Sequence, residues 1–179
     1  LGKTDGIIAP FCIRITSSMP QGAGLWVGNS RKQLFTRTVP ATISAIERMF
    51  NLKEGRDFWW GQPPAKLGIP KPIVKPKDWS HVISFKNGFV WHLISLEVKG
   101  SANSMTVNSI IADEARFLRK EKLDAEVMPT LSGITHPTNH PGFTLENPYY
   151  KSTLFVSDAA LTQRESWLEK EEEKCTKEI

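Results

Sequence analysis

The sequence predicts an α/β fold in which a mostly parallel sheet is flanked by helices. Helical and strand patterns alternate along the chain in the order helix, strand, helix, hairpin, strand, helix, strand, helix. Such alternation is typical of parallel strands that are joined by helical crossovers. The 179 residues suffice for one domain, and a composition of 40% hydrophobic and 23% charged residues indicates a globular chain.

The first half of the chain predicts a helix, a strand and a second helix. Residues 5–20 are mostly apolar and predict a helix despite Pro10, and residues 24–30 predict a short buried strand. A second helix is predicted within residues 31–50, with Pro40 in its first turn. Its apolar residues recur at helical spacing: Ile43, Ile46, Met49 and Phe50.

Turn residues and apolar runs define the second half. Residues 61–80 contain five prolines and four lysines and predict a loop. Two β-rich runs around Asn87-Gly88 predict a hairpin over residues 81–95. The remaining elements are a strand over 106–114, a segment over 115–131 that opens as a helix, a loop over 133–150, a strand over 152–159 and an exposed charged helix at the end.

Composition and chain ends narrow the class of protein. No apolar run approaches the ~20 residues of a membrane span, so we expect no membrane association. Cys12 and Cys175 form no CxxC pair, which favours a reducing compartment. The net charge of +4 is compatible with a nucleic-acid partner. Because the chain starts without a methionine and stops inside a charged helical pattern, we expect a fragment that is cut at both ends.

Two adjacent carboxylates, Asp113 and Glu114, follow the buried run "SIIA". Ligands of open α/β sheets bind at the carboxyl ends of the strands. There, Asp113 is a candidate to hold Mg²⁺ through water, and Glu114 to orient and deprotonate an attacking water. The alternative is that the pair only stabilises the start of the following helix. Polar residues also end two other strands, at Asn29-Ser30 and Ser157-Asp158.

The triplet Gly2-Lys3-Thr4 matches the end of the phosphate-binding pattern GxxxxGK[ST]. In that pattern backbone amides surround phosphates, the lysine reaches the β- and γ-phosphates, and the hydroxyl binds Mg²⁺. The triplet opens an apolar helix, and Asp113-Glu114 follow about a hundred residues later. Both halves of an ATPase site therefore occur in the expected chain order.

In chain order, these stretches resemble the large terminase subunit of tailed phages, specifically its N-terminal DNA-packaging ATPase, a P-loop NTPase of the ASCE type. "LGKT" resembles the tail of Walker A, "SIIADEARFL" resembles Walker B, and "TLFVSDAALTQRESWLEKE" is similar to the strand with the coupling motif. "GLWVGNSRKQLFTRTVPATISAIERMF", the hairpin "VISFKNGFVWHLIS" and "VMPTLSG" also match in order, so the resemblance covers nearly the whole chain.

The resemblance implies ATP and Mg²⁺ as cofactors and assigns roles at matching positions. Gly2, Lys3 and Thr4 would contact the ATP phosphates and Mg²⁺. Asp113 would bind the Mg²⁺ shell together with Thr4, and Glu114 would activate water.

The resemblance also implies a motor and its partners. Ser157, with Asp158, would sense the γ-phosphate and couple hydrolysis to DNA movement. The family translocates double-stranded DNA into a viral capsid as a homo-oligomeric ring on the portal protein, together with a small terminase subunit. We therefore expect assembly in the host cytoplasm, transiently on the procapsid.

The pattern departs from the family at both ends. The first half of Walker A, the adenine-contacting segment and the central first strand would lie upstream, and a nuclease domain would lie downstream. Residues 1–179 would be a single partial ATPase domain that starts within Walker A, and we expect it to be inactive alone. The family's sheet order makes the strands at 152–157, 107–112 and 24–29 neighbours and leaves an exposed edge beside 152–157.

Two other functions remain open. "IIADEA" also resembles the Walker B motif of DEAD-type helicases, so a helicase-like DNA-dependent ATPase is the alternative enzyme, although no helicase arginine motif is recognisable. In a non-catalytic α/β binding module, the pair Asp113-Glu114 would be only a helix cap.

Other polar residues have both a structural and a functional interpretation. His136 and His140 form a candidate metal pair, but their flanking prolines disfavour helical geometry. The lysines of the 63–77 loop are candidates for contact with DNA phosphates, or belong to a stiff, solvated loop. Three basic residues follow the first predicted strand: Arg31, Lys32 and Arg37. They are candidates for contact with DNA or with a neighbouring subunit's ATP, or they are solvated charges on the helix.

Overall fold

The protein is described by a computed structural model that covers residues 2–98, 100, 102, 104–159, 162 and 166–177. Its centre is a six-stranded sheet in the order β2-β3-β4-β1-β5-β6. The parallel strands are β4 (Val90–Ser95), β1 (Ala23–Gly28), β5 (Ser109–Asp113) and β6 (Ser152–Val156). The antiparallel strands are β3 (Val82–Phe85) and β2 (Phe58–Trp60). The predicted α/β class with a mostly parallel sheet is confirmed.

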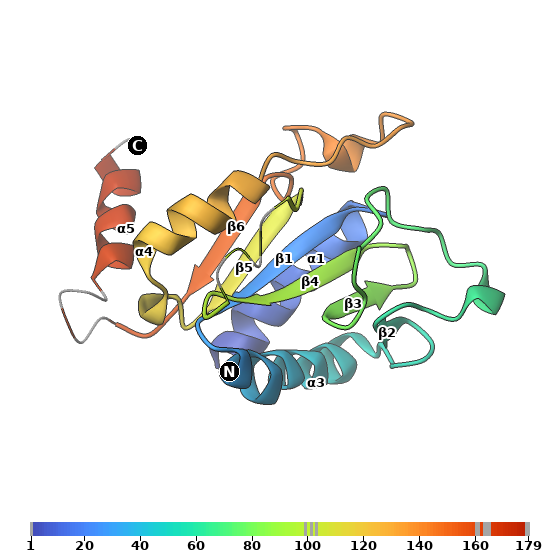
Figure 1. Cartoon of the computed structure of the whole chain (residues 1–179), viewed down its shortest axis with the longest axis horizontal. Coiled ribbons are helices and arrows are strands. Elements are labelled where there is room, and N and C mark those ends of the chain that lie inside the picture. Colours follow the sequence, from blue (N-terminus) through green and yellow to red (C-terminus); the bar gives the residue numbers. More distant parts are fainter. Residues whose placement is uncertain are drawn as a thin grey trace.

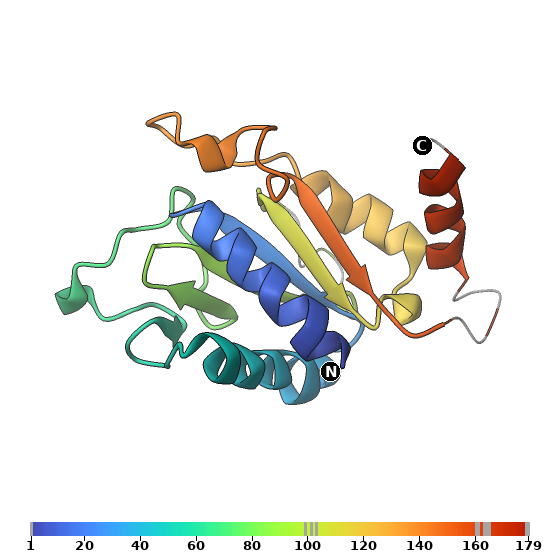
Figure 2. The same cartoon turned by 180° about the vertical axis from the view of Figure 1, so that it is seen from behind.

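Helices cover both faces of this sheet (Figures 1 and 2). The first is η1 (Thr4–Ile8) with α1 (Ala9–Ser18), and the second is α2 (Arg31–Gln33), η2 (Leu34–Thr38) and α3 (Val39–Phe50). The opposite face carries α4 (Lys120–Lys122), η5 (Leu123–Val127) and η6 (Met128–Thr130), and α5 (Trp167–Lys177) follows. Single 3-10 turns are η3 (Ala65–Leu67), η4 (Ala115–Phe117) and η7 (Pro141–Phe143).

The two faces of the sheet form two apolar cores. Trp26, Trp91 and Ile111 pack under α1 and α3, whereas Leu25 and Ile110 pack on the face that α4 and η5 cover. Every residue of β1 is buried. Strands that are buried on both sides are continuous apolar runs, which explains why "GLWVG" shows no alternation.

The hairpin is confirmed, and its turn lies where the sequence places it. β3 and β4 pair antiparallel, with Val82 opposite His92. Gly88 has a φ of +83°, which residues with a Cβ rarely adopt, and the backbone N–H of Phe89 donates to Asn87 Oδ1 at 3.1 Å. β2 extends this hairpin to three antiparallel strands. It has only three residues, and such a length is too short for periodicity to reveal.

Three helical segments contain widened, π-type turns, each of which ends two residues before a proline. The residue before each proline donates its N–H five residues back: Ala9 to Thr4, Val39 to Leu34 and Met128 to Leu123. Proline lacks an N–H, and its ring clashes with the carbonyl four residues earlier. Widening by one residue removes that conflict, so the helices continue through the prolines.

The second helix is longer than Pro40 suggests, because it runs from Arg31 to Phe50. Ile43 and Ile46 are buried, but Met49 and Phe50 are 43% and 37% exposed, so only the first two belong to the core. Helical spacing identifies a face, but it does not show how far along that face the sheet provides cover.

The segment 115–131, which is predicted to open as a helix, is helical in two separate parts. Residues Ala115–Phe117 form one 3-10 turn, Leu118 and Arg119 are extended, and the helix begins only at Lys120. Leu118 is 2% exposed. At this break Leu118 packs into the core on the face that α4 and η5 cover. The predicted strands at 106–114 and 152–159 are also shorter than expected, as the bounds of β5 and β6 show.

The packing of β1 leads to a stability prediction at Gly24. A Cβ at this position would overlap the indole ring of Trp91, which is fully buried and donates from Nε1 to Thr16 Oγ1 at 2.9 Å. The ring therefore cannot move without losing a buried hydrogen bond. We expect Gly24→Ala to lower the free energy of unfolding by about 1–3 kcal/mol in a urea titration.

A matched control is Gly6→Ala, because a Cβ at Gly6 meets no atom within 4 Å. Gly6 lies in η1, so alanine should leave stability unchanged or raise it by up to about 1 kcal/mol. Equal stability of the two variants would contradict the close contact between β1 and Trp91.

Candidate functional site

The parallel pairing of β5 and β6 aligns two of the predicted polar strand ends. Asp113 is opposite Val156 in the register, so Glu114 and Ser157-Asp158 follow side by side. The first helix begins beside the tips of both strands (Figure 2). The amino end of η1 and the carboxyl ends of β5 and β6 therefore meet at one edge of the sheet, as the sequence predicts.

Lys3 joins these elements. Its Nζ lies 3.0 Å from Glu114 Oε1 and 2.8 Å from Asp158 Oδ1, across sequence separations of 111 and 155 residues. Burial alone would lower the pKa of Lys3, but the hydrogen bonds to Asp158 and Glu114 outweigh it and raise the pKa. Lys3 is therefore charged, and the two carboxylates hold its ammonium group at the edge.

Glu114 has a backbone conformation that non-glycine residues seldom adopt, with φ +51° and ψ +43°. This left-handed geometry turns the chain sharply after β5. Glu114 is at the N-cap position of η4, but its side chain forms no cap hydrogen bond there. Within the described residues, Oε2 is shielded from solvent without a hydrogen-bond partner, 3.8 Å from Arg116 Nε. A buried acceptor of this kind is suited to a ligand or a water.

Asp113 is half-buried and held from two sides. Its Oδ1 accepts the backbone N–H of Glu114 at 2.9 Å, and the Thr38 hydroxyl also donates to its carboxylate. Burial raises the pKa of Asp113, and the Glu114 charge adds to this effect, while both hydrogen bonds and Lys3 oppose it. The carboxylate thus pays a desolvation cost that a bound cation would relieve.

An open cleft of ≈ 350 Å³ lies at this edge of the sheet, and neither Lys3 nor Asp158 lines it. Thr4, Asp113 and Glu114 line it, and the wall opposite consists of residues from the second helix and η4: Gln33, Arg37, Thr38, Ala41, Arg116 and Phe117. Its volume lies within the range that small-molecule sites occupy, about 300–1,000 Å³.

The donors of this cleft fit a magnesium nucleotide. Thr4 and Asp113 offer hard oxygen ligands, and the helix at Lys3 has no side-chain cap, so its amide N–H groups can bind an anion. In the described part of the chain no group of three or more His, Cys, Asp or Glu residues could hold a metal. Mg²⁺ usually binds one or two carboxylates plus waters and substrate phosphates, so a smaller protein set suffices.

Not every predicted site residue contributes its side chain to the cleft or to the contacts of Lys3. Ser157 Oγ accepts the backbone N–H of Arg116 at 3.2 Å, and it is Asp158 that contacts Lys3. Gly2 is exposed, and its carbonyl accepts the N–H of Gly6. Ser30, at the third polar strand end, caps the second helix through Gln33 N–H.

Sequence patterns missed Gln33, Thr38 and Arg116. They lie in helical or turn segments with no motif, and only packing brings them to the cleft. Thr38 ends the widened turn that precedes Pro40, so this proline is the one local sequence signal near Thr38.

The candidate metal pair has a local explanation. His136 Nδ1 accepts the N–H of Thr138, and His140 Nδ1 accepts the N–H of Gly142. The two rings lie 5.5 Å apart and pack with Phe143. These contacts stabilise the loop.

Comparison with known proteins identifies no family for this chain. No protein-family model matches the chain, and no curated protein matches it either. Within the described residues, no helix combines the length and apolar character needed to cross a bilayer. The case for a function therefore depends on the geometry of this site.

Asp113 provides a test of the site's electrostatics. Because burial raises its folded pKa, ionised Asp113 destabilises the fold, and the protonated form becomes favourable as pH falls. Asp113→Asn retains an acceptor oxygen and removes the charge. We expect it to raise the urea midpoint at pH 8, with a gain that shrinks as pH falls through the raised pKa.

Asp57→Asn is the matched comparison with the opposite sign. Burial raises the pKa of Asp57, but hydrogen bonds from the Lys53 N–H and Arg56 outweigh it and lower the pKa. That stabilisation is present above the unfolded pKa and lost as pH falls through the folded one. We expect Asp57→Asn to destabilise the protein at pH 8. A loss of stability in Asp113→Asn at pH 8 would contradict the desolvation of Asp113.

Proposed function

We propose that this chain is part of a DNA-packaging motor, the large terminase ATPase, which hydrolyses ATP to move double-stranded DNA into a viral capsid. One observation carries the proposal: Lys3 at a helix start contacts Glu114 and Asp158 at two parallel strand ends. This contact brings the residues assigned to the two proposed motifs to one edge of the sheet, beside the cleft that Thr4, Asp113 and Glu114 line. On this proposal the motor is a homo-oligomeric ring that works with a portal protein and a small terminase subunit.

The cleft residues divide the work of binding. Lys3 and the uncapped amides at the start of η1 would pair with phosphate oxygens, in place of the carboxylates that now hold Lys3. Thr4 and Asp113 would hold Mg²⁺, which neutralises charge on the phosphates. Thr38 orients Asp113 through its hydroxyl and is a positioning residue.

Glu114 is suited to water activation. Its Oε2 has no hydrogen-bond partner among the described residues, so it can accept a proton from water while Lys3 leaves for the phosphates. The left-handed backbone at Glu114 fixes this carboxylate at the strand end. Asp158 and Ser157 lie on the next strand end, where a change at the phosphates can be transmitted along the segment after β6.

The exposed lysines in the loop between β2 and β3 favour the proposal of a polyanionic partner. Lys66, Lys71, Lys75 and Lys77 are all exposed, and Figure 1 shows this green segment extending beyond the sheet. The loop is held in shape because Gln21 Nε2 donates to the Lys71 carbonyl at 2.7 Å. A rigid row of cations can contact phosphates without reading bases, as translocation requires.

Glu114→Gln tests the hydrolysis. A complete phosphate-binding loop needs residues before the triplet at 2–4, so the assay uses the polypeptide translated from the complete reading frame. We expect kcat for DNA-stimulated ATP hydrolysis to fall at least about a hundredfold, with ATP affinity retained. The control Glu121→Gln, at an exposed residue outside the cleft, should hydrolyse normally.

Turnover that survives Glu114→Gln would make the carboxylate pair structural and would remove the motor assignment of these residues. No hydrolysis by the unmutated polypeptide would favour a non-catalytic binding module. ATP-dependent strand separation by the unmutated polypeptide would instead favour the helicase-like alternative.

Replacing the four loop lysines by glutamine tests the DNA contact. We expect weaker binding to duplex DNA and a smaller salt dependence, because the log–log slope falls by about 0.9 for each phosphate that the variant no longer neutralises. Lys151→Gln with Lys170→Gln, which removes exposed charge elsewhere, should cost less affinity per charge. Unchanged affinity in the loop variant would exclude this surface as the DNA contact.

A further inference from the structure

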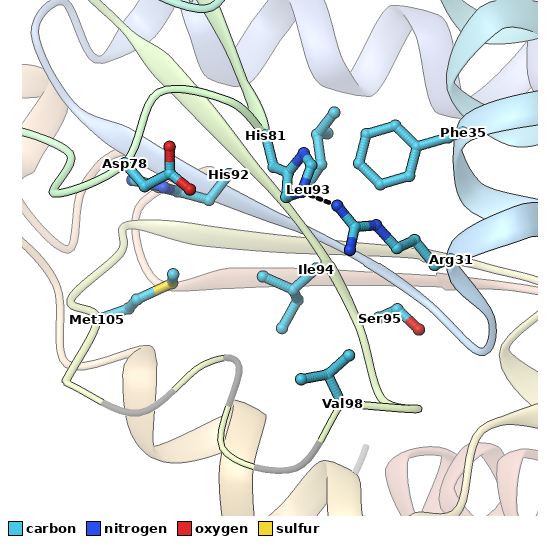
Figure 3. A pocket seen from close by; sticks show the side chains of 10 residues that line it. All are labelled: Arg31, Phe35, Asp78, His81, His92, Leu93, Ile94, Ser95, Val98 and Met105. Carbon is cyan, nitrogen blue, oxygen red and sulfur yellow. Dashed lines mark hydrogen bonds between the residues drawn. The ribbon is translucent and has the colours of Figure 1, made fainter.

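A second cavity, of ≈ 220 Å³, lies beside the start of the second helix (Figure 3). Arg31 and Phe35 line it, whereas Gln33 and Arg37 of the same helix line the carboxylate cleft. Residues four apart share a helix face and residues two apart do not. The cavity is therefore a separate site, with side chains that the proposed hydrolysis does not use.

Aromatic rings fix the orientation of Arg31. Its guanidinium lies 5.9 Å from the centre of the Phe35 ring, which in turn lies 5.0 Å from the His81 ring. Figure 3 shows the contact from Arg31 to His81 Nε2 as a dashed line. Guanidinium only donates, so Nε2 accepts, and His81 Nδ1 donates to the Ser80 carbonyl at 2.8 Å.

The charge of Arg31 is not neutralised inside the cavity. In the described part of the chain no carboxylate pairs with its guanidinium. Glu97 accepts the backbone N–H of Arg31 instead, at 3.0 Å. Asp78, at the opposite end of the view in Figure 3, accepts the N–H and hydroxyl of Ser80 at 2.8 and 2.7 Å. The guanidinium thus retains donors for an oxyanion, and Asp78 would direct that oxyanion to the Arg31 end.

The rest of the lining is apolar or uncharged. Leu93 and Ile94 contribute alkyl surface from β4, and Met105 adds a thioether. Burial lowers the pKa of His92 to about 4, so its imidazole is neutral at pH 7. A single oriented cation beside an apolar wall suits a ligand with one acidic group and a compact hydrocarbon body.

We propose that this cavity binds a small organic anion, whose oxyanion pairs with Arg31 and whose apolar body packs against Ile94 and Phe35. The volume is below the ~300–1,000 Å³ of most ligand sites, so the occupant is small. A carboxylate and a phosphate ester both match the guanidinium fork. The site does not depend on ATP hydrolysis, and its test reads binding alone.

The experiment is a calorimetric titration of the 179-residue chain with benzoate and with phenyl phosphate at pH 7 and low salt. We expect at least one probe to bind with a Kd near or below about 1 mM. The neutral isostere benzamide should bind at least about tenfold more weakly. Arg31→Gln should weaken the anion about tenfold or more, whereas Lys32→Gln, a change of equal charge beside it, should stay within about twofold.

A second measurement needs no variant. On titration of the unmutated chain with the tighter probe, the ring NMR signals of His81 and His92 should shift while those of His136 remain unchanged. A preference for benzoate or phenyl phosphate identifies the oxyanion. Equal binding of benzamide, full affinity in Arg31→Gln, or no saturable binding of either probe would overturn the proposal.

Discussion

The candidate site depends on the parallel register of β5 with its neighbours. Ile111 faces the core under α1, so Asp113, two residues on, faces the same side, where Thr38 and Lys3 lie. A slip of one residue would turn Asp113 to the face that η5 covers and would separate it from both. Both faces of β1 and β5 are buried, so such a slip would also exchange the side chains that fill the two apolar cores. The core therefore fixes the positions of the carboxylates.

The prolines inside the helices act on the same site. Pro10 and Pro40 each follow a widened turn. The turn before Pro10 begins at Thr4, the turn before Pro40 ends at Thr38, and both threonines line the cleft. In an unbroken α-helix, the side chains of the residues before each proline would point in a different direction around the helix axis. Local steric conflict at a proline thus contributes to the direction in which two hydroxyl residues project. The third widened turn, at Leu123–Val127, lies on the other face of the sheet, so widening alone does not define a site.

How far the sequence predicts the structure depends on how local each signal is. Strand patterns and the Asn87-Gly88 turn predicted the hairpin, whereas the three neighbouring parallel strands were expected only from the sheet order that the resemblance implies. The match of Gly2-Lys3-Thr4 and Asp113-Glu114 to two motifs in chain order predicted that these residues meet. Thr38 and Arg116 were not predictable, because tertiary packing alone brings them to the cleft. The extended break at Leu118 and Arg119 has no local sequence signal, and Leu118 is buried there by tertiary packing. Met49 and Phe50 continue an apolar face beyond the point where the core covers it.

Charge explains why the ends of β5 and β6 are held together without a ligand. Asp113, Glu114 and Asp158 place three carboxylates at one edge, and Lys3 bridges two of them. Without that bridge the carboxylates would repel each other, and half-buried Asp113 would be costlier still. An incoming phosphate would compete for the same ammonium, which frees Glu114, and an accompanying cation would then compensate the carboxylates. On the proposed function, the contact between Lys3 and Glu114 is the one that a bound phosphate would replace, so binding at Lys3 and release of the Glu114 carboxylate would be a single exchange.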